Sequence, residues 1–409
     1  MRTTDTVPRV NQFGAHLRDQ WMLDPAVTYL NHGTVGAPPR QILELQQSIR
    51  NDIERQPATY LLRNLADVDG KPRRAAPLMR DAAAVVAQFV GADVDDLVFL
   101  DNATTGANAV LRSYPFVPGD EILVTTFGYG GVTNVANYVA RTQGLVVRTI
   151  TMPPPNPAVG SVHPQAYIDA IAAAIGGNTA GRTKMLLIDH ITASTALIMP
   201  IAEIAAVCHD RGVLVLVDGA HGPGSIALDI PALGVDWYFG NLHKWAWTPR
   251  SAGLLWVAPQ HHSYLHAPVT SWGLDRGIAA EFDAFGTRDP SPYLAAPGSI
   301  EMMESWGLED IFDYNHNLAW QAGQLLSTRW NMPFSTPEQM IASMVCVTLP
   351  TRLGSTIHDA QRVRDALLFD ANIEVPTTAT ETGMTMRVST QVYNDLEDID
   401  RLGDAIDRL

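Results

Sequence analysis

The sequence predicts an α/β protein with a mostly parallel seven-stranded sheet covered by helices, followed by a smaller α+β C-terminal domain. Short, continuously apolar segments alternate with helical patterns over most of the chain, and this alternation stops after residue 257. Strands that are apolar throughout are typical of a sheet with helices on both faces. We expect an N-terminal segment at residues 1–29, a large domain at 30–275 and a small domain at 276–409.

Seven apolar segments are the expected strands of the large sheet: Leu97–Leu100, Glu121–Thr126, Leu145–Met152, Lys184–Asp189, Val213–Asp218, Trp237–Gly240 and Leu254–Val257. Helical patterns occur at Gln41–Arg55, Gly106–Ser113, Pro164–Ile175 and Ile201–Arg211. Residues 258–300 are rich in Pro, Gly, His and Trp, and we expect loops there. The small domain is expected to run strand, helix, strand, helix at Met340–Leu349, His358–Phe369, Met384–Ser389 and Asp395–Leu409.

Composition narrows the class of function. The 409 residues carry a net charge of −15, which disfavours binding to nucleic acid or to an anionic membrane surface. The first twenty residues contain no apolar signal region, and no apolar run is long enough to span a bilayer. Two cysteines, Cys208 and Cys346, cannot form a disulfide framework, which fits a cytoplasmic protein. None of the 12 histidines is spaced like a zinc helix motif, so we expect no metal.

One of the three lysines, Lys244, follows a predicted strand and lies among aromatic residues in the segment Gly240-Asn241-Leu242-His243-Lys244-Trp245-Ala246-Trp247. Burial lowers the pKa of a lysine and makes it a competent amine nucleophile. A lysine whose ammonium reaches water is the alternative. Asp218 ends an apolar strand 26 residues earlier, so both residues are expected at strand ends, where open α/β sheets bind ligands. Asp218 alone would fit a helix cap or a metal ligand equally well.

A phosphate site is indicated where the strand Leu97–Leu100 turns into a helix through Thr104 and Thr105. Free N–H groups at a helix start, together with hydroxyl groups, bind phosphate, although an ordinary threonine cap has the same sequence. The segment is not a Walker loop, and Gly128-Tyr129-Gly130-Gly131 is not a dinucleotide fingerprint. A reactive lysine, a strand-end carboxylate and a phosphate site together indicate pyridoxal 5′-phosphate as the cofactor.

With these motifs, the chain from Tyr29 to Leu409 resembles the fold-type I pyridoxal-phosphate enzymes of the class V aminotransferase and cysteine desulfurase family, and within it the isopenicillin N epimerase-like branch. The resemblance implies that Lys244 forms the Schiff base, that Asp218 pairs with the pyridine nitrogen and that His221 lies near the phenolic oxygen. Further implied cofactor contacts are Thr104, Thr105 and His243 with the phosphate, Asn241 as a weaker match, and Tyr129 stacked on the ring. A core aromatic is the alternative for Tyr129.

The resemblance also implies contacts beyond the cofactor. Thr287 matches a residue that reaches the phosphate of the neighbouring subunit, which implies a homodimer with shared active sites. Arg387 matches the arginine that binds the substrate α-carboxylate, although a surface arginine would look the same in sequence. Asn31 and His32 match an N-terminal segment near the substrate.

Two departures bear on the reaction. Desulfurases carry a nucleophilic cysteine shortly before the carboxylate arginine, and residues 374–385 contain none here. The desulfurase asparagine at the phenolic oxygen is replaced within Ile191–Thr195, where either Thr192 or Ser194 could serve. We therefore expect an enzyme acting at the α-carbon of an amino acid, foremost a C–S lyase on a cysteine-derived substrate in specialised metabolism. The alternatives are an epimerase, decarboxylation-coupled deamination, aminotransferase chemistry, or a non-catalytic protein that keeps the fold.

Overall fold

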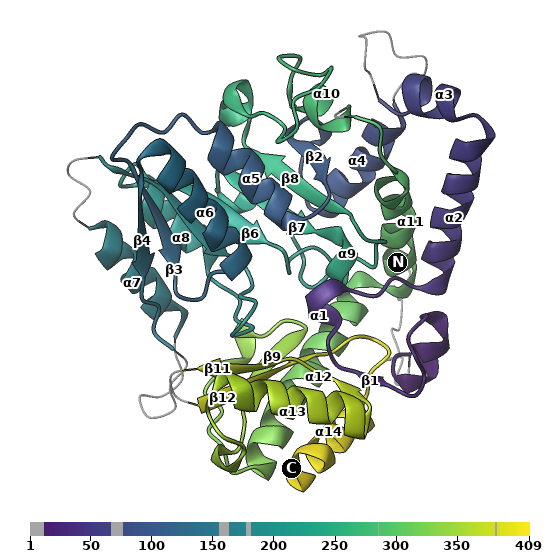
Figure 1. Cartoon of the computed structure of the whole chain (residues 1–409), viewed down its shortest axis with the longest axis vertical. Coiled ribbons are helices and arrows are strands. Elements are labelled where there is room, and N and C mark those ends of the chain that lie inside the picture. Colours follow the sequence, from purple (N-terminus) through teal and green to yellow (C-terminus); the bar gives the residue numbers. More distant parts are fainter. Residues whose placement is uncertain (1–11, 67–76, 155–162, 177–180, 285, 381–382) are drawn as a thin grey trace, which may run out of the picture.

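The computed structural model describes residues 12–66, 77–154, 163–176, 181–284, 286–380 and 383–409. Figure 1 shows a large sheet with helices on both sides and, beneath it, a smaller sheet with helices of its own. The short helix α1 (His32–Val35) lies between these two parts.

The large sheet contains seven strands in the order β2-β8-β7-β6-β5-β3-β4. Their bounds are β2 (Leu97–Leu100), β3 (Glu121–Thr125), β4 (Val146–Ile150), β5 (Thr183–Asp189), β6 (Leu214–Gly219), β7 (Trp237–Asn241) and β8 (Gly253–Val257). Only β8 runs antiparallel to its neighbours, so the expected mostly parallel seven-stranded sheet is confirmed. Parallel pairing brings the carboxyl ends of β5, β6 and β7 to one edge, and Asp189 lies opposite Asp218 there.

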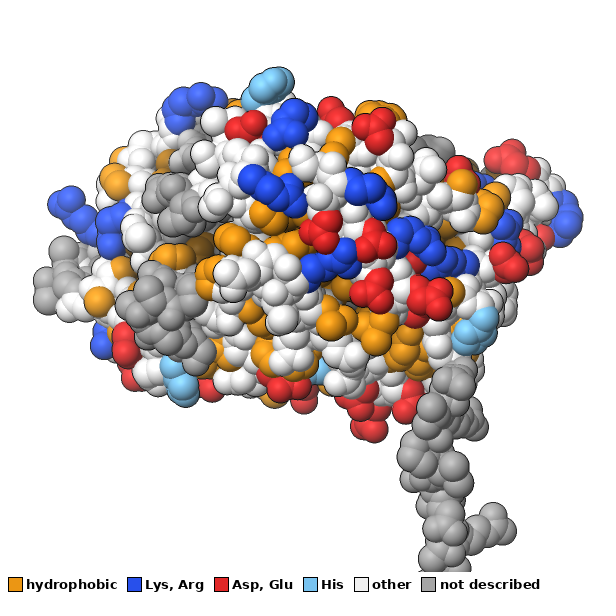
Figure 2. Space-filling view, turned by 90° about the horizontal axis from the view of Figure 1, so that it is seen from below, with side chains coloured by type: hydrophobic (Ala, Val, Ile, Leu, Met, Phe, Trp, Pro, Cys, Tyr) orange, Lys and Arg blue, Asp and Glu red, His pale blue; other side chains and the backbone are white. Residues whose placement is uncertain are grey.

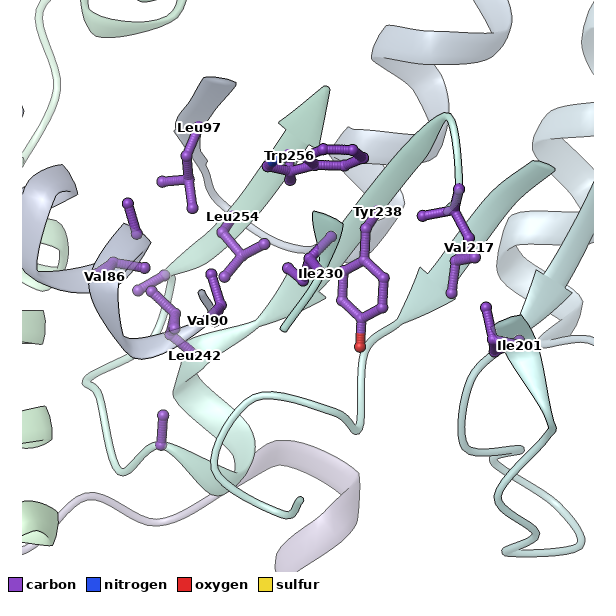
Figure 3. Packing of buried hydrophobic residues seen from close by; sticks show 14 of the residues in the cluster. Val86, Val90, Leu97, Ile201, Val217, Ile230, Tyr238, Leu242, Leu254 and Trp256 are labelled. Atoms are coloured by element: carbon purple, nitrogen blue, oxygen red, sulfur yellow. The ribbon is translucent and has the colours of Figure 1, made fainter. Parts of the chain in front are cut away.

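Both faces of this sheet are buried, as the apolar strands predict. In β8, Leu254 and Trp256 belong to the same buried cluster as Val86 and Val90 (Figure 3), whereas Leu255 joins the core on the other face. The first face is covered by α4 (Leu78–Phe89), α7 (Pro164–Ile175), α8 (Ile201–His209) and α11 (Ser291–Trp306). The second face is covered by α5 (Ala103–Ser113), α6 (Gly130–Gln143) and α10 (Ile278–Asp283).

The expectation of loops throughout residues 258–300 is wrong, because α10 and the start of α11 lie there. Pro292 lies in the first turn of α11, where a missing N–H costs no hydrogen bond, so proline content misled the prediction. Ile300 and Met303 are buried in the core beside the large sheet, where α11 packs against α4 and α2 (Arg40–Arg55). The division between residues 275 and 276 stays a prediction.

The small part is built on an antiparallel sheet in the order β11-β12-β9, with β11 (Thr377–Thr380), β12 (Gly383–Ser389) and β9 (Met344–Thr348). Its helices are α12 (Leu308–Arg329), α13 (Ile357–Ala371) and α14 (Leu396–Arg408). The expected strand–helix–strand–helix order is confirmed, whereas β11 and α12 were not anticipated. The N-terminal segment joins this part, because β1 (Thr28–Tyr29) pairs in parallel with β10 (Ile373–Glu374).

The surface of the small part mixes Lys and Arg side chains with Asp and Glu, as Figure 2 shows for the face seen from below. Among the described residues, we find no helix with the length and apolar character needed to cross a bilayer.

Candidate active site

A cavity of about 400 Å³ opens at the carboxyl edge of the large sheet, between the two sheets. Eight of the predicted site residues line it: Thr104, Tyr129, Asp218, His221, Asn241, His243, Lys244 and Arg387. Four do not line it, namely Asn31, His32, Thr105 and Thr287. The cavity therefore joins residues from segments that are far apart in the sequence.

Lys244 lies in α9 (Leu242–Trp245), a single turn directly after β7, so its amine faces the cavity from the strand end. Its Nζ atom is 3.2 Å from Nε2 of His221. Burial lowers the pKa of Lys244 to about 8, although the carboxylate of Asp218 opposes this. The lowered pKa increases the fraction of this amine that is uncharged near neutral pH, and the uncharged amine is the form that attacks an aldehyde.

Asp218 lies at the end of β6 with one oxygen committed and one available. Its Oδ1 accepts a hydrogen bond from the backbone N–H of Ala220 at 2.9 Å. Its Oδ2 is buried and has no hydrogen-bond partner among the described residues. Burial raises the pKa of Asp218 to about 6. An unpartnered buried carboxylate oxygen is costly, and a protonated pyridine nitrogen would satisfy it.

His221 is held as a neutral ring between two neighbours. Its Nδ1 accepts a hydrogen bond from the indole N–H of Trp245 at 3.2 Å, and its Nε2 faces Lys244. Burial lowers the pKa of His221 well below its ordinary value. The adjacent strand end is close-packed, because a Cβ on Gly219 would lie 2.1 Å from the ring of Tyr238. Only glycine fits there.

The predicted phosphate site is the start of α5. Asn102 caps this helix, because its Oδ1 accepts the backbone N–H of Thr105 at 3.1 Å. Asn241 ties the same turn to β7, since its Oδ1 accepts the N–H of Ala103 at 2.9 Å. Thr104 lines the cavity, whereas Thr105 does not. The start of α5, where Ala103 and Thr104 border the cavity, and the Thr104 hydroxyl fit a phosphate group.

Arg387 enters the cavity from β12 in the small sheet. Its Nη1 donates to the carbonyl of Ala193 at 2.7 Å, and its Nη2 donates to Oγ1 of Thr34 at 2.7 Å. Its Nε is buried and has no partner within the part of the chain that the structure describes. A planar guanidinium with an unused N–H beside the cavity fits a carboxylate ligand.

The N-terminal residues lie behind this wall. Asn31 donates from Nδ2 to Glu374 at 2.8 Å, and its Oδ1 lies 3.5 Å from Nη2 of Arg387. His32 is completely buried, with Nε2 2.8 Å from the backbone oxygen of Lys244 and Nδ1 2.8 Å from the hydroxyl of Tyr393. Both ring nitrogens are thereby used within the protein. Neither Asn31 nor His32 lines the cavity, and their predicted place near the substrate stays a prediction.

The alternatives Thr192 and Ser194 are separated by the structure. Thr192 is turned away from the cavity, since its Oγ1 lies 2.6 Å from Oγ1 of Thr195 and accepts the N–H of Leu197 at 2.9 Å. Ser194 lines the cavity. Of the two residues, only Ser194 borders the cavity, and its contact with the phenolic oxygen of the cofactor stays a prediction.

Sequence reasoning missed Asp189, a second buried carboxylate in the cavity wall. It ends β5 opposite Asp218, and its Oδ1 accepts the backbone N–H of Tyr129 at 3.3 Å. Burial and the charge of Asp218 raise the pKa of Asp189 well above its ordinary value, because two adjacent buried carboxyl groups do not both ionise readily. Its position at the end of an apolar strand, like that of Asp218, was the signal available in the sequence. The raised pKa values of both carboxyl groups favour fewer than two negative charges at this edge of the sheet.

The predicted site contains neither cysteine. Cys208 is buried in α8, where burial raises the pKa of its thiol to about 12. Cys346 pairs with Arg387 across β9 and β12 but does not line the cavity. Elsewhere in the described residues, His266, Asp275 and Glu281 bring possible metal ligands within 4.8 Å of one another. Glu281 already accepts hydrogen bonds from the backbone N–H groups of Ala267 and Asp275. The expectation that the protein binds no metal stays a prediction.

Comparison with known proteins adds an independent observation. The model of the Aminotransferase class-V family matches residues 67–402. The chain is 33% identical to the probable L-cysteine desulfhydrase, chloroplastic, of Arabidopsis thaliana, over 94% of this chain and 83% of that protein. It is 32% identical to isopenicillin N epimerase of Amycolatopsis lactamdurans, over 97% and 98% of the two chains. The apo structure of cysteine desulfurase from Thermococcus onnurineus NA1 aligns with a TM-score of 0.75 and 20% identity, over 98% of each chain.

Proposed function

The chain belongs to the aminotransferase class-V family, and from this premise we propose that it is a pyridoxal 5′-phosphate-dependent C–S lyase acting on cysteine or a close derivative. The observation that carries the proposal is one cavity that combines the Lys244 amine, the unpartnered oxygen of Asp218 and the unused N–H of Arg387. These groups fit, in turn, the aldehyde, the pyridine nitrogen and the carboxylate of an amino acid bound to the cofactor.

Each group has a defined task. The cofactor, when bound, withdraws electrons from the substrate α-carbon. Asp218 holds the pyridine nitrogen in its protonated form, and Arg387 fixes the α-carboxylate. Lys244, once its amine is free, takes the α-proton at Nζ. The Cα–H electron pair then becomes available to expel the sulfur from the β-carbon.

The overall reaction balances without an oxidant. The Cβ–S bond breaks with both electrons on sulfur, which takes a proton and leaves as hydrogen sulfide from cysteine or as a thiol from an S-substituted derivative. The remaining three-carbon enamine is hydrolysed by water to pyruvate and ammonia. Release of the sulfur as a free product is supported by the absence of cysteine from the cavity wall among the described residues, since no protein thiol lies there to accept the sulfur.

The names of the relatives support C–S cleavage and epimerisation about equally. One bears the name of a cysteine desulfhydrase and the other that of isopenicillin N epimerase, at 33% and 32% identity. Epimerisation would need a second proton donor opposite Lys244. Tyr129 lines the cavity and is the candidate for that role. The epimerase therefore remains the second candidate.

Product analysis tests the proposal. The enzyme loaded with pyridoxal 5′-phosphate is incubated with L-cysteine in deuterated water, with Lys244→Ala as the control. Equal amounts of pyruvate and sulfide are expected from the wild type and neither from the variant. Recovered amino acid that carries deuterium and inverted configuration, without pyruvate, would establish epimerisation instead. Transfer of the amino group to a keto acid, or release of carbon dioxide, would contradict both.

We also propose a cytoplasmic homodimer with shared active sites. Thr287 lies away from the cavity of its own chain, in a hollow of about 180 Å³ that it shares with Leu62 and Trp272. The side chains of Leu62 and Trp272 are 65% and 78% exposed. Large exposed apolar residues beside a hollow favour contact with a second subunit, which would bring Thr287 toward the partner's phosphate site.

A further inference from the structure

We propose that Trp245 is a positioning residue: its indole N–H fixes the His221 tautomer that holds Lys244 as a free amine. The inference deepens the proposed function, because the free amine is the form of Lys244 that captures the cofactor. It concerns a residue that touches neither the cavity nor any predicted ligand.

The indole of Trp245 decides which nitrogen of His221 carries the proton. Indole Nε1 of Trp245 can only donate, and its partner at 3.2 Å is Nδ1 of His221. Nδ1 must therefore present a lone pair. A neutral imidazole carries exactly one N–H, so the proton of His221 is on Nε2. A doubly protonated ring could not accept from the indole, and the complete burial of His221 disfavours its charged form as well.

The proton on Nε2 of His221 constrains Lys244, whose Nζ atom lies 3.2 Å away. An Nε2–H group can only donate along this line, so the lysine nitrogen must accept. A free amine has the lone pair required, whereas an ammonium group has none. The hydrogen bond between His221 and Lys244 therefore forms only when the amine is uncharged. The indole of Trp245 thus opposes protonation of Nζ through His221.

Packing around Trp245 restricts the orientation of its indole ring. Trp245 is completely buried in a cluster with Ile191, Ala342 and Met344. Its ring also packs on that of His32, with the ring centroids 5.1 Å apart. Close packing on both sides holds Nε1 toward His221, so the tautomer is decided by the core rather than by solvent.

Other groups that act on Lys244 come from three strands. They are Asp218 of β6, Asp189 of β5 and Arg387 of β12. All three remain in place when Trp245 is replaced by phenylalanine, which keeps a ring in the core and removes the N–H. Nδ1 of His221 is then free to carry the proton, Nε2 can accept from an ammonium group, and the charged form of Lys244 gains a hydrogen bond.

The experiment measures how the capture of pyridoxal 5′-phosphate by the cofactor-stripped protein depends on pH, followed by the absorbance of the bound cofactor. The wild-type rate should rise with a midpoint of about 8. For Trp245→Phe the midpoint should be about half a unit to one unit higher, the shift expected for one hydrogen bond. The matched control is Trp247→Phe, because Trp247 is equally buried and its Nε1 has no partner among the described residues. Its midpoint should equal the wild-type value.

An unshifted midpoint in Trp245→Phe would overturn the inference. A second measurement does not depend on the variant folding: nitrogen NMR of histidine-labelled wild-type protein distinguishes the two neutral tautomers of His221. The Nε2–H tautomer is expected, and the Nδ1–H tautomer would overturn the inference. Failure of the wild type to capture the cofactor at any pH would contradict the proposed function instead, so the two failures are distinguishable.

Discussion

Arg387 and Ala193 join the two sheets of this protein, because Nη1 of the arginine donates to the backbone carbonyl of Ala193 at 2.7 Å. Arg387 belongs to β12 of the small sheet, whereas Ala193 lies in the loop that follows β5 of the large one. The same guanidinium donates to Thr34 at 2.7 Å from its Nη2. The residue proposed to bind the substrate carboxylate is thus held in place from both sides of the cavity.

Replacing Arg387 by lysine should impair substrate capture more than turnover. Lysine keeps the charge but cannot reproduce the planar set of N–H groups, so kcat/KM should fall about 100-fold, mainly through KM. Steady-state kinetics with L-cysteine measures this. Arg352→Lys, at a half-exposed arginine of the small part, is the control and should leave kcat/KM unchanged. Equal kinetics for both variants would remove Arg387 from the substrate site.

Substitutions at Asp218 and Arg387 should move the deprotonation of Lys244 in opposite directions. The Asp218 carboxylate raises the pKa of Lys244 and the Arg387 guanidinium lowers it, around a value of about 8. Asp218→Asn should therefore lower the pH midpoint of cofactor capture, and Arg387→Ala should raise it. The measurement is the capture rate at saturating pyridoxal 5′-phosphate across pH 6 to 10. Shifts of the same sign would contradict this electrostatic account.

Asp189→Asn should preserve cofactor binding. Burial and the neighbouring charge of Asp218 raise the pKa of Asp189 well above its ordinary value, which favours the neutral carboxyl group, and asparagine is a close neutral substitute for that form. We expect the dissociation constant for pyridoxal 5′-phosphate to change by less than about threefold, whereas Asp218→Asn should weaken binding by about tenfold or more. Equilibrium dialysis provides both constants. A loss at Asp189 as large as that at Asp218 would mean that Asp189 carries the charge.

His32→Ala should destabilise the fold. The substitution leaves the carbonyl of Lys244 and the hydroxyl of Tyr393 without their buried partner and opens a cavity, which should cost about 2–4 kcal/mol. Urea unfolding monitored by circular dichroism measures the change. The exposed His358 provides the control, and His358→Ala should alter the free energy of unfolding by less than about 0.5 kcal/mol. An unchanged free energy of unfolding in His32→Ala would show that the hydrogen bonds of His32 do not stabilise the fold.

Trp272→Asp should convert the proposed dimer to a monomer, because a charge at the centre of an apolar interface remains unpaired on association. Analytical ultracentrifugation reports the mass of the wild type and the variant. Phe369→Asp changes an equally exposed aromatic of α13, 74% exposed, and should leave the dimer intact. A monomeric wild type, or an undisturbed dimer in Trp272→Asp, would refute the proposed interface.

Much of the site could be predicted because its residues lie where local pattern is informative. Lys244 and Asp218 each follow an apolar strand, and Thr104 begins a helix, so the strand-end rule places them at one edge of a parallel sheet. The pattern could not separate Thr104 from Thr105, whose backbone N–H is used by the Asn102 cap. Nor could it decide between Thr192 and Ser194, because which hydroxyl closes a turn depends on that turn's geometry.

The amino-acid order alone was sufficient to predict the large sheet and the order of elements in the small part, because both follow from the spacing of apolar residues. It was also sufficient to identify Lys244 and Asp218 as site residues, because each is recognised from a few adjacent residues. Packing in three dimensions established the partnership of Asp189 with Asp218, the clamp of His32 on the Lys244 carbonyl and the line from Trp245 through His221 to Nζ. Those relationships depend on angles and distances of a few ångströms between segments separated by up to 212 residues. Such geometry exists only once the core has closed around it.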